Sequence, residues 1–329
     1  MIVSVVIPVY NAAPFIARCA RSLFMQSFDD VEYIFVDDGC TDESIDILRQ
    51  TLAQFPQLES RVRIIAHDTN RGSAMARSTG MHAATGDYII QVDSDDYVLP
   101  HYLSSLVEVA QREQAQVTIC NYYVVHNNVV KLVTIPQLTD ATACLCKILT
   151  GEVHNGLWNK LIKRQLIVDN DIYPVEGINM YDDKSVMFRV MYFAERVAYL
   201  DQALYYYNKA NPQSITAQRK EFEIDPASRF VRLAHNFFAT HQASPQVTQA
   251  LDLFKMGAWG LVLLYGDAEQ RNNLRPLLSG KHSISMVMHQ QLLPSHYRIA
   301  VALDKLHLSP CFSWLYKLIR RSRHHGNSK

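Results

Sequence analysis

Residues 31–42 read VEYIFVDDGCTD, a short β-branched apolar run that ends in two aspartates and a glycine. A buried strand of a parallel sheet is apolar along its whole length, because helices cover both faces of the sheet. Thr41 is a candidate N-cap, and Asp42 and Glu43 would lie in the first turn of a following helix, where carboxylates favour the helix dipole. The stretch therefore predicts a strand, a turn and a helix, which together form one βα unit.

The same alternation of strand-like and helix-like segments continues along the first third of the chain. Apolar residues within 15–24 recur at helical spacing, which places one apolar stripe on a helix. A succession of four or five βα units predicts an α/β fold with an open, mostly parallel, doubly wound sheet, in which ligands bind at the carboxyl ends of the strands. The other strand-like runs occupy residues 2–7, 61–66, 88–92 and 116–120.

The pattern then changes. Two short apolar runs, 122–125 and 129–134, flank Asn127 and Asn128, and this arrangement predicts a hairpin at a sheet edge. The remainder of the chain after about residue 222 is helical in pattern. Near the end, residues 312–323 read FSWLYKLIRRSR and predict a basic amphipathic helix that docks on anionic lipid; a solvated tail is the alternative.

The composition is that of an ordinary globular protein. The 329 residues are 48% hydrophobic and include 32 Lys and Arg against 32 Asp and Glu. Zero net charge argues against binding of nucleic acid over a basic face. The six cysteines show neither a Cys-x-x-Cys pair nor zinc-finger spacing, which favours reduced thiols in a cytoplasmic protein. No segment approaches the ~18 to 20 apolar residues that span a bilayer, so we expect any membrane contact to be peripheral.

Three aspartates, Asp93, Asp95 and Asp96, follow the fourth strand-like run within four residues. Carboxylates this close repel one another, and burial at a strand end would raise the cost unless a cation neutralises them. Oxygen ligands at this spacing suit Mg²⁺ or Mn²⁺ shared with substrate phosphates. The pattern therefore indicates a metal site. A solvated acidic turn that caps the next helix is the alternative.

The ends of the first two predicted strands also carry polar side chains. Asp37 and Asp38 suit hydrogen bonds to a ribose hydroxyl or to a base, and Tyr10 suits stacking on a flat base. Each signal is weak when taken singly, because a βα turn and an exposed loop tyrosine explain these residues equally well.

The end of the third predicted strand leads into a helix with a small-residue face. Asn70 and Gly72 open this helix. The helix N-terminus, with Arg71 or Arg77, would face a diphosphate. Close packing of the helix on the sheet is an equally good explanation of the small residues.

Four ordered segments of the chain resemble the family 2 glycosyltransferases of the GT-A fold. The resemblance continues through residues 157–161, 181–184 and 205–215, so that it covers roughly residues 1–216. It implies a GT-A domain over 1–216, with a nucleotide-binding half at 1–120 and an acceptor half at 121–216, followed by a helical region at 217–329. The four segments are 5–11 (VVIPVYN), 36–42 (VDDGCTD), 70–77 (NRGSAMAR) and 86–96 (GDYIIQVDSDD).

The resemblance implies roles for the strand ends. Tyr10 and Asp38 look like the positions that contact uracil, with Asp37 beside them. Residues 93–96 look like the DxD region, which holds the metal and the ribose of a nucleotide sugar. Asp95 and Asp96 are both candidates for the principal ligand of Mn²⁺ or Mg²⁺. The residues expected to bind the donor are Pro8, Tyr10, Asn11, Asp37, Asp38, Asn70, Gly72, Arg77, Asp93 and Ser94.

Two neighbouring aspartates are expected at the reaction centre. Asp183 is similar to the catalytic base of the family, and it would take the proton of the acceptor hydroxyl in an attack that inverts the anomeric centre. Asp182 would point to another side, because positions i and i+1 of a helix do not face each other, and would cap the helix or bind an acceptor hydroxyl. Plain N-capping by the pair is the alternative.

The expected acceptor site includes Trp158 and Lys160, although a Trp buried as a domain anchor is at least as good an interpretation of Trp158. The implied partners are a UDP-sugar donor and a saccharide or lipid-linked acceptor. The implied process is hexosyl or N-acetylhexosaminyl transfer in cell-surface polysaccharide synthesis, in the cytoplasm or on the inner face of the membrane.

The sequence departs from the family pattern at three positions, with Cys40, Ser78 and Asp182 in place of the commoner Ser, Asn and Glu. None of these changes removes a charge that the mechanism needs, so an active enzyme is favoured. A haloacid-dehalogenase-type phosphatase also has Asp-x-Asp after an apolar strand, but there the motif normally opens the fold. A non-catalytic binding subunit with the same fold is the other alternative.

Overall fold

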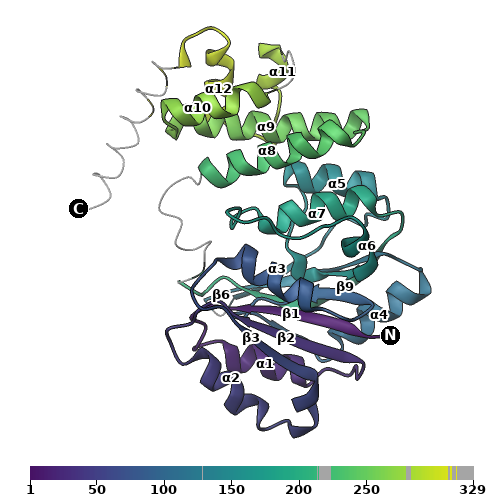
Figure 1. Ribbon diagram of the computed structural model, residues 1–329. Helices are drawn as coiled ribbons and strands as arrows, with labels where there is room; N and C mark the ends of the chain where they lie inside the picture. The colour runs from purple at the N-terminus through teal and green to yellow at the C-terminus, as the bar shows by residue number, and fades with distance from the viewer. Residues whose placement is uncertain are drawn as a thin grey trace. The chain divides into compact units, whose positions relative to one another are not determined.

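The computed structural model describes residues 1–127, 129–212, 214, 224–278, 283–309, 312 and 316. The chain separates into two compact units, of which the first comprises 1–148 and 153–218 and the second comprises 149–152 and 219–329. The first unit contains the sheet and the second is helical (Figure 1). The predicted boundary between residues 216 and 217 lies outside the described residues.

Four parallel strands form the first half of the sheet, in the order β3-β2-β1-β4. All four match strand-like runs of the sequence. In their register Val9 pairs with Asp37, and Asp37 pairs with Ala66, so the carboxyl ends of three strands meet at one edge. The strands are β1 (Val3–Val9), β2 (Val31–Asp37), β3 (Val62–Ala66) and β4 (Tyr88–Gln91).

The second half of the described sheet is mixed. The order continues from β4 through β8 and β6 to β9 and β5, with β6 and β9 parallel and the other neighbours antiparallel. The predicted hairpin is present as β6 and β7, and β7 pairs with β6 outside this order. The strands are β5 (Tyr97–Val98), β6 (Val117–His126), β7 (Val129–Val133), β8 (Lys160–Lys163) and β9 (Val197–Asn208).

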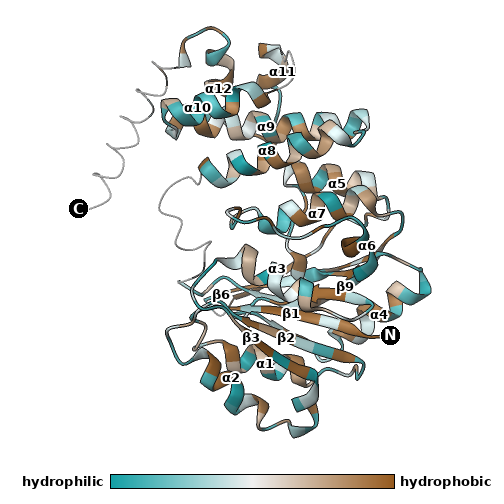
Figure 2. Cartoon of the chain, viewed as in Figure 1, coloured by the Kyte–Doolittle hydropathy of each residue, from teal (hydrophilic) through white to brown (hydrophobic). Residues whose placement is uncertain are grey.

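Helices cover both faces of the sheet. Figure 1 shows α1 and α2 on one face and α3, α6 and α7 on the other. The central strands are hydrophobic in Figure 2 because they are buried between these layers. The helical elements of the first unit are α1 (Ile16–Phe24), α2 (Ser44–Leu52), η1 (Pro56–Arg61), α3 (Ser73–Ala83), α4 (Tyr102–Arg112), α5 (Ala141–Thr150), η2 (Leu157–Asn159), α6 (Arg164–Asp169) and α7 (Asp182–Phe193).

The start of α2 differs from the sequence prediction. The helix begins at Ser44, and Thr41 is not its N-cap. The Thr41 backbone N–H instead donates to Asn11 Oδ1 at 2.9 Å. Asn11 adopts a positive φ of 46° just after β1, which turns its side chain amide toward the β2–α2 turn. The first two strand ends are therefore tied together before α2 starts.

The second unit consists of helices in its described part. Ser244 caps the longest of them by accepting a hydrogen bond from the Val247 N–H at 3.3 Å, and Pro245 occupies the first turn. Residues 312 and 316 are the described part of the predicted basic helix, so that prediction lies largely outside the described residues. The helices are α8 (Ile224–Thr240), α9 (Pro245–Tyr265), α10 (Ala268–Leu274), η3 (Arg275–Leu277), α11 (Ile284–Met288) and α12 (Ser295–Asp304).

Helix α9 corrects one expectation from the sequence. Its 21 residues are long and apolar enough to cross a membrane by length and composition, whereas no such segment was expected from the sequence. The helix includes Lys255, and 72% of its most apolar window is buried within the protein. A helix that is apolar on all sides is equally a core helix of a large domain, and this burial fits that role.

Gly80 allows α3 to pack directly on β1 and β2. A Cβ at this position would lie 2.3 Å from Val6 Cγ1 and 3.3 Å from Val36 Cγ2. We expect Gly80→Ala to lower the free energy of unfolding by about 1 to 3 kcal/mol through overpacking, although Ala is the better helix former. Urea denaturation measures the change. A Gly80→Ala protein as stable as the wild type would contradict this close packing.

Candidate active site

The strand ends of β1 and β2 and the loop after β3 converge on one rim of the sheet. Tyr10 follows β1 and its side chain is 49% exposed. Gly39 has a φ of +73°, and a Cβ there would lie 2.7 Å from the Asn70 backbone N. Glycine therefore lets the two loops touch. Asp37 Oδ1 accepts a hydrogen bond from the Cys40 N–H at 2.8 Å, which closes the turn after β2.

Asp38 holds the loop that leads into α3. Its buried carboxylate accepts hydrogen bonds from the Arg71 N–H at 2.9 Å and from the Gly72 N–H at 2.8 Å. His67 Nδ1 lies 2.7 Å from Asp38 Oδ1, and His67 Nε2 lies 2.9 Å from Thr79 Oγ1. Sequence reasoning missed this role of His67 in holding Asp38. The position of His67 directly after β3 is the feature that could have indicated it. The predicted uracil contact of Asp38 stays a prediction.

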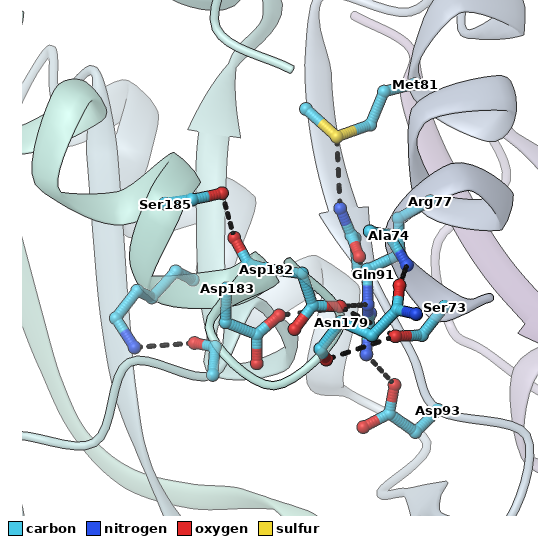
Figure 3. A network of polar contacts seen from close by, with 12 residues as sticks. Ser73, Ala74, Arg77, Met81, Gln91, Asp93, Asn179, Asp182, Asp183 and Ser185 are labelled. Carbon is cyan, nitrogen blue, oxygen red and sulfur yellow. Dashed lines mark hydrogen bonds and ion pairs between the residues drawn. The ribbon is translucent and has the colours of Figure 1, made fainter. Parts of the chain in front are cut away.

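Arg77 lies at the centre of a buried polar network (Figure 3). Its side chain is 8% exposed. Nε donates to Asp182 Oδ2 at 3.1 Å, Nη1 to Gln91 Oε1 at 2.5 Å and Nη2 to Asp93 Oδ1 at 2.6 Å. All three nitrogens thus donate to protein oxygens. The structure places Arg77 between β4 and α7, and its predicted contact with a diphosphate stays a prediction.

The start of α7 docks on the N-terminus of α3. Ser73 Oγ donates to Asp182 Oδ2 at 3.0 Å, and the Ala74 N–H donates to Asn179 Oδ1 at 3.3 Å. Gly72 has a φ of +88°, and a Cβ there would lie 2.5 Å from Asn179 Nδ2. Gly72, which was predicted to contact the nucleotide-sugar donor, therefore permits the close approach of the α7 start to α3. Sequence reasoning missed Asn179, because nothing in its local pattern marks it.

Asp183 and Asp182 both approach Arg77 Nε, whereas adjacent helical residues were expected to face different sides. Asp183 Oδ1 is buried and has no hydrogen-bond partner among the residues that the structure describes, and it lies 3.8 Å from Arg77 Nε. Burial raises the pKa of Asp183 to about 7; Arg77 opposes this shift, and Asp182 and Asp93 add to it. A carboxylate with a pKa near neutrality is suited to general base catalysis.

The predicted metal-binding turn divides into two kinds of aspartate. Asp96 is fully buried, and its oxygens accept hydrogen bonds from Tyr205 OH at 2.5 Å and from the Asn208 N–H at 2.7 Å. Asp95 Oδ2 accepts one hydrogen bond from Asn211 Nδ2 at 2.8 Å. Burial, with the nearby charge of Asp93, raises the pKa of Asp95 to about 6. Asp96 is therefore used to hold β9, and Asp95 is the better placed of the two as a ligand.

The residues at this turn fit a divalent cation that takes some of its ligands from the protein and the others from a substrate. The described residues contain no group of three or more His, Cys, Asp or Glu side chains placed to hold a metal ion by themselves. Asp93 and Asp95 flank Ser94 and repel each other, so added positive charge is favoured between them. Mg²⁺ and Mn²⁺ commonly use one or two carboxylates together with substrate phosphates.

The two residues predicted at the acceptor lie in the core. Trp158 is 1% exposed and stacks on Tyr205, with ring centroids 4.4 Å apart. Lys160 is fully buried, and its Nζ donates to the carbonyls of His154 and Gly156 and to the side chain of the preceding residue. Burial lowers the pKa of Lys160 to about 8. Both side chains thus hold the segment before β8. Burial of Trp158 matches the alternative interpretation of that residue, and contact of Lys160 with an acceptor stays a prediction.

Solved structures share this fold. Residues 1–349 of S. aureus TarS, in complex with UDP-GlcNAc, match with a TM-score of 0.71 at 19% identity, over 98% of this chain and 92% of that chain. The mannosyltransferase PcManGT from Pyrobaculum calidifontis, in complex with GDP-Man and Mn²⁺, matches with a TM-score of 0.54 at 17% identity, over 92% and 86%. The predicted α/β fold of GT-A type with a helical C-terminal region is confirmed.

The sequence comparisons give the family. Residues 4–167 match the model of glycosyl transferase family 2, and the chain belongs to this family. An uncharacterized glycosyltransferase, EpsJ of Bacillus subtilis, is 33% identical over 65% of this chain and 63% of its own length. The glycosyltransferase GlyG of Streptococcus pneumoniae is 29% identical over 70% of this chain and 78% of its own length. The chain thus matches less than two thirds of EpsJ.

Gly72→Ala tests the close approach of α7 to α3. We expect the substitution to lower the free energy of unfolding by about 1 to 3 kcal/mol, because it combines a positive φ with a contact to Asn179. Gly151→Ala is a matched control, since Gly151 has a φ of +81° and a Cβ there would meet nothing within 4 Å. Equal losses in the two variants, measured by urea denaturation, would contradict a role for the contact with Asn179.

Proposed function

We propose that this protein is a metal-dependent, inverting glycosyltransferase that moves a sugar from a UDP-linked donor to a saccharide or lipid-linked acceptor. One observation carries the proposal: a buried carboxylate oxygen of Asp183 without a hydrogen-bond partner among the described residues, close to the strand ends where a nucleotide would bind. The family is one of glycosyltransferases, which supports this class of reaction.

The donor site in this proposal is the rim formed by β1, β2 and β4. The exposed ring of Tyr10 stacks on the base, and the carboxylates of Asp37 and Asp93 accept hydrogen bonds from nucleoside hydroxyl or N–H groups. TarS in complex with UDP-GlcNAc supports a UDP-linked donor. PcManGT, in complex with GDP-Man and Mn²⁺, supports a divalent cation. When bound by Asp95, Mg²⁺ or Mn²⁺ would neutralise the charge of the diphosphate.

Asp183 accepts the proton of the acceptor hydroxyl in this proposal. Its neighbour Asp182 is less suited to the task, because Ser73 and Arg77 already donate to Asp182 Oδ2. Attack from the side of Asp183, opposite the leaving diphosphate, inverts the anomeric centre in one displacement and needs no covalent intermediate. Hexosyl or N-acetylhexosaminyl transfer, cell-surface polysaccharide as the product, and a cytoplasmic or membrane-peripheral location are further parts of the proposal.

Asp183→Asn tests the base. We expect UDP release from a panel of UDP-sugars with Mn²⁺ to fall by about 10² to 10⁴, because the amide cannot accept the proton. UDP affinity, measured by calorimetry, should change little. Asp46→Asn on the exposed surface of α2 is the matched control. An Asp183→Asn enzyme with the wild-type rate would refute the base, and a wild-type protein that neither binds UDP nor uses any UDP-sugar would refute the function.

The pKa of Asp183 predicts opposite pH trends for activity and stability. Transfer should rise about tenfold per pH unit below pH 7 and level off above it, because the base must be ionised.

Burial raises this carboxyl pKa above its usual value of ~4, so its contribution to folding is lost as the pH rises from about 4 through 7. Thermal unfolding should therefore show that Asp183→Asn raises the Tm relative to the wild type, and that this rise is larger at pH 8 than at pH 5. A constant difference would contradict the raised pKa.

A further inference from the structure

We propose that Arg77 is a positioning residue, which fixes the distance between the donor-side carboxylate of Asp93 and the proposed base Asp183. The inference rests on the proposed function and deepens it. It differs from the sequence prediction, in which Arg77 itself contacts the diphosphate.

The guanidinium joins two distant parts of the chain. Through Nη2 it holds Asp93, 16 residues away at the end of β4, and through Nε it holds Asp182, 105 residues away at the start of α7. Asp183 follows Asp182 directly and lies 3.8 Å from the same Nε. One side chain therefore spans the gap between the donor rim and the helix that carries the base.

The helix α3 holds Arg77 in a fixed position. Ser73 Oγ donates to the α7 start and the Ala74 N–H donates to Asn179 in the preceding loop, so Arg77 is one of three residues of α3 that bind this region. Nη1 is held by Gln91 Oε1 on β4. With each nitrogen engaged and the side chain 8% exposed, the guanidinium is fixed by the protein before any substrate binds.

The shape of arginine matters at this position. Its planar fork directs N–H groups along fixed, divergent directions, and here the directions lead to Asp93, Gln91 and Asp182. A lysine ammonium is a single point of charge and cannot reach all three acceptors at these distances. Lysine would keep the charge but lose the geometry.

Charge makes the bridge necessary. Three carboxylates, those of Asp93, Asp182 and Asp183, surround one guanidinium in a site from which water is largely excluded. Like charges at this range repel unless a cation lies between them. Loss of the fork would allow Asp93 and the α7 start to move apart. Misplacement of a reacting group by about 1 Å can cost about a hundredfold in rate.

The test compares Arg77→Lys with the wild type in steady-state kinetics. The donor is a UDP-sugar that the wild type uses with Mn²⁺, and UDP binding is measured separately by calorimetry. We expect kcat to fall about a hundredfold, while the KM for the UDP-sugar and the Kd for UDP rise by less than about tenfold through the shift of Asp93. Arg112→Lys, at an arginine whose side chain is 59% exposed on α4, is the matched control and should behave as the wild type.

A second variant covers the case in which Arg77→Lys does not fold. Asp182→Asn weakens the contact at α7 and leaves the one at Asp93, so kcat should fall with UDP binding retained. Where Arg77→Lys does fold, the double variant should lose little more than the larger single loss, because both changes act through one contact.

Three results would overturn the inference. A raised KM and weakened UDP binding with kcat preserved would assign Arg77 to the diphosphate. An unchanged kcat in Arg77→Lys would show that the fork positions nothing. Additive losses in the double variant would show that Arg77 and Asp182 act separately. A wild type inactive with every UDP-sugar would instead refute the proposed function, and the inference with it, so the two failures are distinguishable.

Discussion

The candidate active site depends on one buried positive charge, the guanidinium of Arg77. Arg77 stands among the carboxylates of Asp93, Asp182 and Asp183, and these carboxylates would not be tolerated so far from water without it, because a buried charge is stable only when it is paired. This constraint explains why Arg77 on α3 reaches the residues at the end of β4, and why α7 begins against the first turn of α3. The proposed base therefore owes its location to electrostatics as much as to packing.

Two glycines make this arrangement possible. Gly39 lets the loop after β2 touch the loop after β3, and Gly72 lets α7 approach α3 at the level of Asn179. Both have a positive φ, which a glycine adopts without strain. Asp38 then holds the β3–α3 loop by accepting hydrogen bonds from two of its backbone N–H groups. The proposed donor site and the proposed reaction centre thus both depend on the same short loop.

The sequence predicted the strands and the acidic strand ends, because both depend on local pattern. β-branched runs mark β1 to β4, and a strand end in a parallel sheet places polar residues at one rim. The partners of these residues were not predictable, since Arg77 and Asp182 are 105 residues apart and no local pattern links them. The burial of Lys160 was not predictable either, because it depends on three acceptors, namely two backbone carbonyls and one neighbouring side chain. Thr41 failed as an N-cap for a similar reason, as Asn11 holds its N–H.

The long separation between Arg77 and Asp182 also affects how the chain is made. The ribosome releases α3 well before α7, and at about 5 to 20 residues per second the wait for those 105 residues is about 5 to 20 seconds. During that time the guanidinium and the first turn of α3 have no α7 to bind. The contacts of α3 therefore cannot reach their final form on the ribosome until α7 has been made, and the two helices mature as parts of one folding unit.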